Sequence, residues 1–211
     1  IPIILALAIN EVTNDRFRRF TQTVVYAPHL LSTVVLVGIV QQFLSPTNGI
    51  VNQVIQSFGG QPISFMIEPR WFKSIYVWSG VWQRMGWDSI IYLAALTGVD
   101  PNLHDAAKVD GATRLQRIRH INLPTIFPTI VTLLILNAGR VLSVGFEKVY
   151  LMQNTLNMEA SDVISTYVYR TGLMGAQYSY SAAIGLFNSV VNFVMLVVVN
   201  SVSALVHVYS I

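Results

Sequence analysis

The stretch that decides the fold runs from residue 105 to residue 124. It reads Asp105-Ala106-Ala107, three residues, Gly111, nine residues, and then Ile121-Asn122-Leu123-Pro124. Long apolar segments lie on both sides of it, and each is near the ~20 residues that a bilayer-crossing helix needs. The sequence therefore predicts a polar loop between two membrane-spanning helices.

Local signals predict two short helices in this loop. Asp100 is a good N-cap and Pro101 suits the first helical position, so a helix is expected to begin there. Gly111 lets the backbone turn, either through a positive φ or by close approach to a partner. Thr113 and Gln116 have the spacing of a capping box, which predicts the start of a second helix.

The composition favours a membrane protein. Hydrophobic residues make up 53% of the chain and charged residues only 11%, which is roughly half the charged share of a typical soluble domain. The chain contains no cysteine, so disulfides, iron–sulfur clusters and thiolate metal sites are excluded.

Apolar segments of bilayer length predict where the chain crosses the membrane. Four complete spans are expected, at Val24–Leu44, Phe72–Leu96, Pro124–Val144 and Ala182–Val206. The apolar stretch Ile1–Ile9 has no basic region before it, so we interpret it as the cut end of a further span. The chain is therefore expected to be truncated at its N-terminus and to make five crossings in all, counting this remnant.

Charge divides the loops into two classes. The first basic loop and the loop before Pro124 together hold Arg16, Arg18, Arg19, Lys108, Arg114, Arg117 and Arg119. In the alternate loops, basic residues are balanced by acidic ones. Because basic residues in short loops mark the cytoplasmic side, the loop at 105–124 is predicted to face the cytoplasm.

The spacing of this loop resembles the EAA loop of ABC-importer permeases, whose pattern is E-A-A-x3-G-x9-I-x-L-P. Asp105 stands where the family has glutamate, and the other fixed positions match. The resemblance implies a short helix that docks in a groove of the ATP-hydrolysing subunit and transmits its motion. The residues that it assigns to ATPase coupling are Asp105, Ala106, Ala107, Asp110, Gly111, Leu123 and Pro124. An ordinary basic loop would explain the arginines, but not the Ala-Ala, Gly and Leu-Pro positions.

Further segments resemble carbohydrate permeases of the oligo- and polysaccharide branch. They are Tyr26–His29, Ile90–Leu96, Gly145–Leu151, Asp162–Arg170 and Tyr178–Phe187, among others. This likeness covers nearly the whole chain. It implies an all-α membrane protein, a polytopic transmembrane helix bundle of the type I ABC importer permease kind. Residues 1–211 would form a single permease domain with its coupling loop at about 100–124.

The same resemblance implies an assembly in a bacterial cytoplasmic (inner) membrane. A second homologous permease subunit would form a heterodimer with this chain in the lipid bilayer, and two ATP-binding subunits would dock beneath the pair. An extracytoplasmic solute-binding protein would deliver the saccharide, and no nucleic-acid partner is expected. The chain has no G-x-x-x-x-G-K-[ST] or HExxH pattern, so it is expected not to be an enzyme. No cofactor or metal is expected in this chain, since ATP and magnesium would be bound by the ATPase subunits.

Polar residues inside the expected spans are candidates for the transport path, because charges at bilayer depth normally face the bundle interior, form pairs or line a wet cavity. The candidates are Trp82, Gln83, Arg84, Trp87, Asp88, Asn137, Arg140, Asn188 and Asn192. Indole faces stack on the C–H surfaces of sugars, and amides bind sugar hydroxyls. Two structural alternatives stay open. Arg84 and Asp88, at i and i+4, can simply pair with each other, and asparagines can bond between helices.

Two short helices are expected in the outward-facing loops. Apolar residues at helical spacing predict one from Ile50 to Phe58, ended by Gly59-Gly60. The other carries Tyr167 and Tyr169, which either lie near the channel mouth or anchor the chain at the membrane interface.

The favoured function is translocation of an oligo- or polysaccharide by an ATP-driven importer. If Asp88 neutralises Arg84, Arg140 remains as an unpaired charge, which favours an acidic, alginate-like saccharide over a neutral one. In the neutral alternative, backbone carbonyls or the partner permease bind Arg140. An ion-gradient-driven secondary transporter with Asp88 and Arg84 as a relay is the alternative function, but it leaves the 105–124 loop unexplained. A membrane-anchored structural protein would not need polar groups in its spans.

Overall fold

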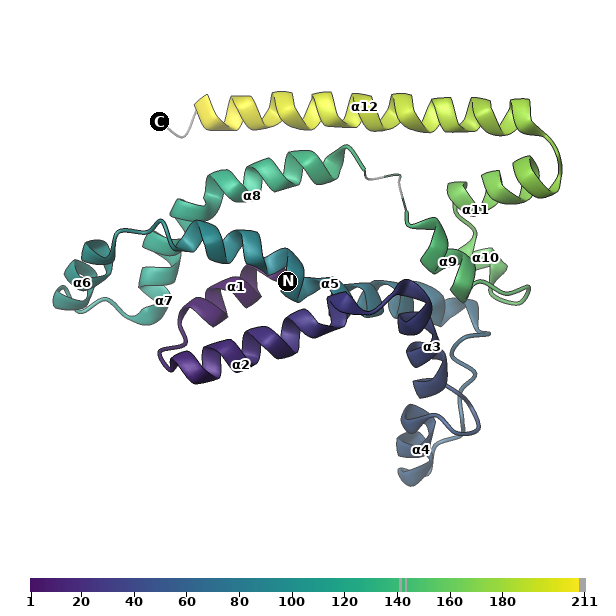
Figure 1. The fold of residues 1–211 in the computed structure, drawn as a ribbon, viewed down its shortest axis with the longest axis horizontal. Helices are drawn as coiled ribbons and strands as arrows, with labels where there is room; N and C mark the ends of the chain where they lie inside the picture. Colours follow the sequence, from purple (N-terminus) through teal and green to yellow (C-terminus); the bar gives the residue numbers. More distant parts are fainter. Residues whose placement is uncertain (141, 143, 209–211) are drawn as a thin grey trace. The chain divides into compact units, whose positions relative to one another are not determined.

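The structure is a computed structural model that describes residues 1–140, 142 and 144–208. Over these residues the secondary structure is helical and contains no β-strand (Figure 1), which confirms the expected all-α fold. The elements are α1 (Pro2–Asn10), α2 (Asp15–Tyr26), η1 (Ala27–Leu30), α3 (Thr33–Phe43), α4 (Ile50–Ser57), α5 (Pro69–Leu96), α6 (Pro101–Val109), α7 (Arg114–Arg117), η2 (Ile118–Asn122), α8 (Leu123–Ala138), α9 (Phe146–Met152), α10 (Met158–Ser161), α11 (Ile164–Val168), η3 (Tyr169–Met174) and α12 (Tyr178–Val208). Of the η segments, η1 is a 3-10 helix, and η2 and η3 are π-helices.

The chain divides into two compact units. The first unit comprises Ile1–Leu30, Trp82–Ala138 and the described part of Leu196–Ile211. The second unit comprises Leu31–Val81 and Gly139–Met195. Each unit has a small hydrophobic core of its own.

The core of the first unit joins α1, α5 and α8. Its buried members are Ala6, Leu96 and Ile126, one from each helix. Tyr92 of α5 and Ile130 of α8 pack against them and are partly buried. The helices on which the coupling loop begins and ends, α5 and α8, are therefore packed together where that loop leaves them.

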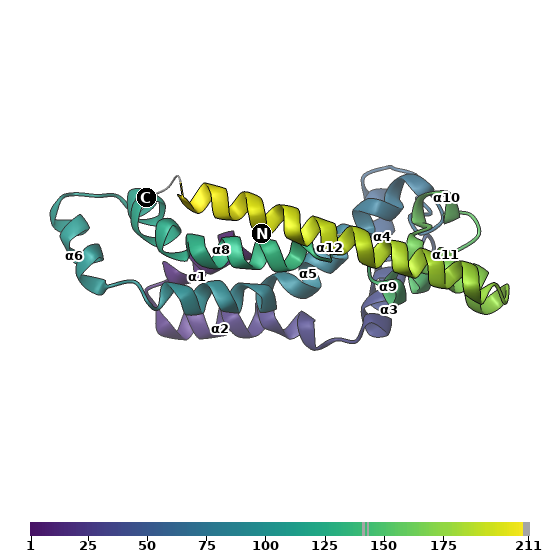
Figure 2. The same ribbon diagram turned by 90° about the horizontal axis from the view of Figure 1, so that it is seen from above.

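A glycine allows α2 to lie against the C-terminal part of α5, as both views show (Figures 1 and 2). A Cβ at Gly86 would overlap the backbone carbonyl of Val25 in α2. Ser89, one turn further along α5, is fully buried and donates a 2.6 Å hydrogen bond to the carbonyl of Gly86. Small residues of this kind let helix backbones approach closely in membrane proteins.

The core of the second unit joins α3, α5 and α9. Val37, Phe72, Val149 and Met152 form its buried cluster. Nearby, the buried side chain of Asn52 in α4 donates to three backbone carbonyls at 3.0–3.3 Å and accepts an N–H at 2.7 Å. Because every hydrogen-bonding site of its amide group except one acceptor position is used, Asn52 ties α4 firmly to the loops around it. The expected short helix at 50–58 is confirmed as α4.

Two helical stretches are long and apolar enough to cross a membrane, Arg114–Ala138 and Tyr178–Val202. They correspond to the expected spans at Pro124–Val144 and Ala182–Val206, although α8 already ends at Ala138. With one bent helix pair counted as a single broken span, the described residues contain three candidate crossings, against the five expected.

The expected span Val24–Leu44 is not one continuous helix. The chain bends by 100° between the α2–η1 segment and α3. Pro28, which has no N–H to donate, lies in the tight turn η1 just before the bend. Ser32 then begins a new helix, because its hydroxyl accepts a backbone N–H from the first turn of α3 at 3.3 Å.

The expected span Phe72–Leu96 is a continuous helix, α5, of 28 residues. At ~1.5 Å per residue this helix is about 42 Å long, more than the ~30 Å hydrocarbon thickness of a bilayer. It is nevertheless not one of the stretches apolar enough to qualify as a span. Polar side chains within it, including Gln83, Arg84 and Asp88, lower its hydropathy.

Candidate coupling loop and transport path

The first helix of the coupling loop, α6, has both of the ends that the sequence predicts. The Asp100 carboxylate accepts the N–H of Asn102 at 2.9 Å, and Pro101 is the first helical residue. At the other end, Asp110 is the C-cap and Gly111 has a φ of +77°. The N–H groups of Gly111 and Ala112 donate back into the last turn at 3.1 and 2.8 Å, which is the Schellman arrangement. The positive-φ alternative for Gly111 is confirmed.

The carboxylate of Asp105 lies on the exposed surface of α6. Lys108, three residues on, donates to it at 2.8 Å. This hydrogen bond and the positive charge of Lys108 hold the pKa of Asp105 below its usual value. Asp105 is therefore ionised at neutral pH and accessible, as a docking contact requires.

The exposed surface of α6 also carries apolar side chains that sequence reasoning did not single out. Leu103 is 52% exposed and Val109 is 89% exposed. Ala106 between them is exposed and Ala107 is half-buried. Leu103, Ala106 and Val109 follow one another at a spacing of three residues, so they lie on one side of α6. The signal was present in the sequence, since the Asp100 cap and Gly111 place both residues inside the first helix of the loop.

The second helix of the loop, α7, begins with the predicted capping box. The N–H of Gln116 donates to the Thr113 hydroxyl at 3.4 Å, and the Gln116 side-chain oxygen accepts the N–H of Thr113 at 2.7 Å. Leu123 and Pro124 follow as exposed residues in the first turn of α8. Between α7 and α8 the chain forms the π-helix η2, which the sequence did not predict.

Asn122, the variable position of the Ile-x-Leu-Pro motif, is a buried anchor of the loop. It is fully buried, and its side-chain amide donates to the Glu11 carboxylate at 3.5 Å. The Asn122 side-chain oxygen and the Arg117 Nε atom are both buried without a partner among the described residues. Sequence reasoning missed this contact, because nothing in the pattern relates residue 11 to residue 122.

A cavity of about 210 Å³ in the first unit brings together three of the predicted path residues. It is lined by Pro2, Arg84, Asp88, Ile91, Tyr92, Leu133 and Asn137. Arg84 Nε lies 3.8 Å from the Asp88 carboxylate, and the Arg84 side chain is 66% exposed. An exposed pair at this distance contributes little to stability. Both side chains therefore remain available to a ligand in the cavity.

The other candidates on α5 lie outside that cavity. Trp87 stacks on His29 of η1, with ring centroids 4.5 Å apart and ring planes 12° apart. One indole face is thus already covered, which leaves its edge and other face for any sugar. Trp82 is exposed, and Gln83 is half-buried.

Three predicted path residues, Arg140, Asn188 and Asn192, belong to the second unit. The side-chain oxygen of Asn192 accepts the N–H of Leu142 at 3.3 Å. That bond ties α12 to the segment after α8, as in the structural alternative for asparagine. The Asn188 side-chain oxygen is buried without a partner among the described residues, whereas Arg140 is exposed.

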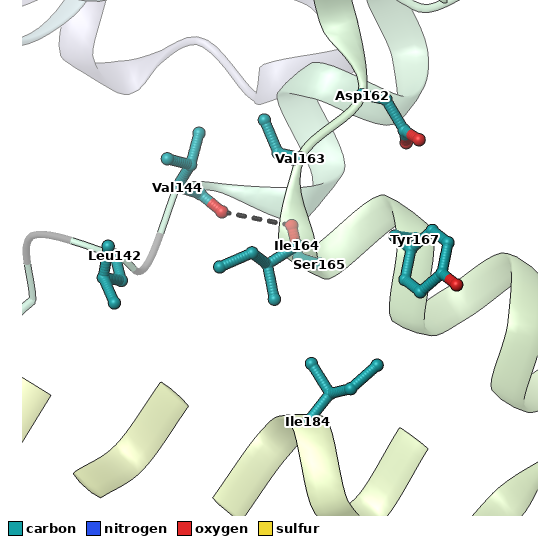
Figure 3. Close-up of a pocket in the computed structure, with 8 residues that line it drawn as sticks. All are labelled: Leu142, Val144, Asp162, Val163, Ile164, Ser165, Tyr167 and Ile184. Carbon is teal, nitrogen blue, oxygen red and sulfur yellow. Dashed lines mark hydrogen bonds between the residues drawn. The ribbon is translucent and has the colours of Figure 1, made fainter. Parts of the chain in front are cut away.

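A larger cavity of about 430 Å³ lies in the second unit around α11 (Figure 3). Ile164 of α11 and Ile184 of α12 point toward one another, and Ser165 donates to the Val144 carbonyl at 3.4 Å. Asp162 at its edge is already bound by Arg170 at 2.6 and 3.3 Å, which holds the pKa of Asp162 below its usual value. The lining is mostly aliphatic.

Tyr167 and Tyr169 both lie in the short helical segment that the sequence predicts there, at the junction of α11 and η3. Tyr169 packs edge-on against Tyr150, with ring centroids 5.2 Å apart. Over the residues that the structure describes, no group of three His, Asp or Glu side chains is placed to hold a metal ion.

Two relatives are similar in sequence to nearly the whole of this chain. The chain is 44% identical to the polygalacturonan/rhamnogalacturonan transport system permease protein YteP of Bacillus subtilis, over 95% of this chain and 62% of the relative. It is also 44% identical to protein LplB of Bacillus subtilis, over 92% of this chain and 61% of the relative. The chain therefore spans about three-fifths of the length of these relatives.

Solved structures agree with the sequence relatives. A chain of a bacterial ABC transporter involved in the import of the acidic polysaccharide alginate matches with a TM-score of 0.94 and 46% identity, covering 96% of this chain and 71% of that one. A bacterial alginate ABC transporter in complex with an alginate pentasaccharide-bound periplasmic protein matches with a TM-score of 0.93 and 46% identity, covering 96% of this chain and 70% of that one. These matches confirm the resemblance to ABC-importer permeases. Because the family model of binding-protein-dependent transport system inner membrane components also matches residues 1–207, the chain belongs to that family.

Proposed function

We propose that this chain is the membrane-spanning permease subunit of an ATP-driven importer of an oligo- or polysaccharide in a bacterial inner membrane. The observation that carries the proposal is the coupling loop. Its α6 helix exposes an ionised Asp105 and the apolar residues Leu103 and Val109. A helix with that surface, ended by a glycine turn, suits the groove of a separate ATPase.

The remaining subunits follow from this assignment. A second permease subunit would complete the path across the bilayer, and two ATPases would bind the coupling loops of the pair. Closure of the ATPases on ATP would move the loops and favour an outward-open path, and hydrolysis would reset the inward-open one. This coupling requires each ligand to bind the alternative states with different affinity.

The cavity around Arg84, Asp88 and Asn137 is proposed as part of the transport path. It contains one cation, one anion and one amide, and its ion pair is loose enough to exchange partners with a ligand. Arg140 is proposed to add positive charge to the route.

An acidic saccharide is the proposed substrate. Two similar proteins support it, since one is named for polygalacturonan, a polymer of a uronic acid, and the other imports the acidic polysaccharide alginate. The excess of arginine over acidic residues among the path candidates agrees with an anionic cargo, because an unpaired cation in a helix bundle is costly unless an anion approaches it. A solute-binding protein would deliver this cargo from outside.

The proposal is tested by reconstituting the transporter in proteoliposomes with its ATPase and binding protein. We expect uptake of trigalacturonate or an alginate trisaccharide that needs internal ATP, and weaker uptake of neutral trisaccharides. Arg140→Gln should reduce uptake of the acidic sugars more than of the neutral ones. Uptake driven by an ion gradient without ATP would refute the importer assignment. Equal uptake of both kinds of sugar, unchanged by Arg140→Gln, would refute the acidic substrate alone.

A further inference from the structure

One lysine of the second unit, Lys148, occupies an unusual position on α9. Its neighbours Val149 and Met152 are fully buried in the core that joins α9 to α5 and α3. The helix that carries Lys148 is therefore fixed, and so is the direction in which its side chain leaves the backbone. Along the chain, α6 of the coupling loop precedes the candidate crossing Arg114–Ala138 and α9 follows it. With α6 on the predicted cytoplasmic side, one crossing places α9 toward the outer side of the membrane.

The ammonium group of Lys148 lies in a niche formed by one turn of α5. Its Nζ donates to the backbone carbonyl of Tyr76 at 2.8 Å and lies 4.7 Å from the centroid of the Tyr76 ring. Gly80 leaves the space that the amine uses, because a Cβ at that position would lie 3.1 Å from Nζ. Lys148 is half-buried there.

No carboxylate neutralises this amine among the described residues. Arg70 and Arg170 of the same unit are each paired with an acid at 2.6 Å, whereas Lys148 forms no ion pair. An ammonium has three donors, and the described residues engage one of them. Burial lowers the pKa of the amine to about 8, so it still carries its charge at neutral pH. A half-buried cation without a counter-charge is costly, and an anion that approaches it offsets part of that cost.

We infer that Lys148 binds a carboxylate of the transported saccharide and selects acidic sugars over neutral ones. This inference rests on the proposed function. The two free N–H donors match a carboxylate, which accepts charge-assisted hydrogen bonds. Nothing in the sequence pattern of the coupling loop or of the spans points to this residue.

A purely structural role of Lys148 would affect the stability of the second unit rather than the affinity for the sugar. As a tether, Lys148 would hold α9 on α5 through the Tyr76 carbonyl, and its removal would loosen the second unit whatever the cargo. Lys148→Met keeps the length and apolar stem of the side chain and removes the charge. Lys148→Arg keeps the charge. Lys73→Met is the matched control, because it removes an exposed positive charge from the first turns of α5, the helix against which Lys148 packs.

The experiment measures ATP-driven uptake of trigalacturonate and of an alginate trisaccharide by the complete transporter, together with its unfolding temperature in detergent. For the imported sugar we expect Lys148→Met to raise the half-saturating concentration about tenfold, the effect of losing one charge-assisted hydrogen bond. Its unfolding temperature should stay at the wild-type value. Lys148→Arg should remain close to wild type, and Lys73→Met should change neither quantity.

Three results would overturn the inference while leaving the importer in place. The first is a half-saturating concentration that Lys148→Met leaves unchanged. The second is an increase in that concentration together with a lower unfolding temperature. The third is an increase in Lys148→Arg as large as in Lys148→Met. If the wild-type transporter imports neither acidic sugar, the proposed substrate is wrong and the role of Lys148 falls with it.

Discussion

Gly111 and Gly59 share the left-handed backbone region, at φ values of +77° and +81°. Open space surrounds both positions, so a side chain would meet no neighbour at either. A residue with a Cβ costs roughly 1–2 kcal/mol in this region. We expect Gly111→Arg to abolish ATP-driven uptake and to weaken co-purification of the ATPase, because it strains the end of the docking helix and adds a bulky charge that hinders its approach to the groove of the ATPase.

The matched substitution Gly59→Arg imposes the same backbone strain at the end of α4, outside the coupling loop. It should leave ATPase binding intact. If Gly59→Arg were as harmful as Gly111→Arg, strain alone would explain the loss, and normal transport in Gly111→Arg would end the assignment of the loop.

Asp105 is one methylene shorter than the glutamate of the family pattern. Asp105→Ala should lose more uptake than Asp105→Glu, which we expect to be nearly neutral. Its partner Lys108 supplies the control, since both side chains of the pair are exposed and the pair adds little to folding. Lys108→Met should therefore retain transport. The reverse order of the two Asp105 variants in uptake assays would show that the carboxylate is not the coupling element.

The lowered pKa of Lys148 predicts how stability and carboxylate binding depend on pH. Its pKa in the folded chain is about 8, against an ordinary value of 10.5, so between these values the unfolded chain binds the additional proton and stability rises with pH. Carboxylate binding follows the opposite course, because the charge disappears as pH rises through about 8. Among the described residues, the titratable group in contact with the amine is Tyr76 of α5.

Uptake of the acidic saccharide should therefore fall as the external pH is raised from 7 to 9, values that bracket this pKa of about 8. Lys148→Arg, whose guanidinium stays charged throughout, should flatten that profile. An identical fall in both proteins would assign the pH dependence to another group.

At the level of elements, the contact between α2 and α5 depends on the missing side chain of Gly86. Gly86→Ala would force a Cβ into the backbone of Val25, which cannot move aside as a flexible side chain would. We expect a loss of about 1–3 kcal/mol in unfolding free energy, as for other overpacked sites. Thermal unfolding in detergent measures it. Gly38→Ala in α3, which meets nothing within 4 Å, should be neutral or stabilising.

Capped helices were predictable from sequence, and helix interruptions were not. Asp100, Gly111 and the Thr113–Gln116 pair each act on a few neighbouring residues, so their geometry follows from local chemistry. The 100° bend before α3 lies within a run of apolar residues that satisfies the hydropathy rule equally well whether straight or bent. Hydropathy measures transfer into the bilayer and is insensitive to helix direction.

For the whole molecule, sidedness follows from the loops and can be measured directly. These 211 residues contain no cysteine, so an introduced cysteine is the single thiol among them that a maleimide can label. Val109 of the coupling loop and Phe58 after α4 are 89% and 88% exposed, which makes them matched positions. A membrane-impermeant maleimide should label Val109→Cys only in inside-out vesicles and Phe58→Cys only in right-side-out ones. Labelling of both from the same side would contradict the predicted topology.

The two parts of the candidate site differ in how far the sequence predicts them. The coupling loop is contiguous, so its spacing alone identifies it. The path depends on residues far apart in the chain, of which Arg84, Asp88 and Asn137 line one cavity. The contacts of Asn122 with Glu11 and of Lys148 with Tyr76 join residues 111 and 72 positions apart. Such pairings are set by tertiary packing, which periodicity does not encode.

The π-helix η2 between α7 and α8 has a consequence for how the coupling loop is oriented. Hydrogen bonds in a π-turn span one residue more than those in an α-turn, and each additional residue rotates an α-helix by about 100°. A helical wheel drawn through α8 and continued backwards therefore assigns the side chains of α7 to the wrong azimuth. The side of α7 that points toward a docked subunit is fixed by this one-residue offset, which acts like a phase shift between the membrane helix and the loop that it carries.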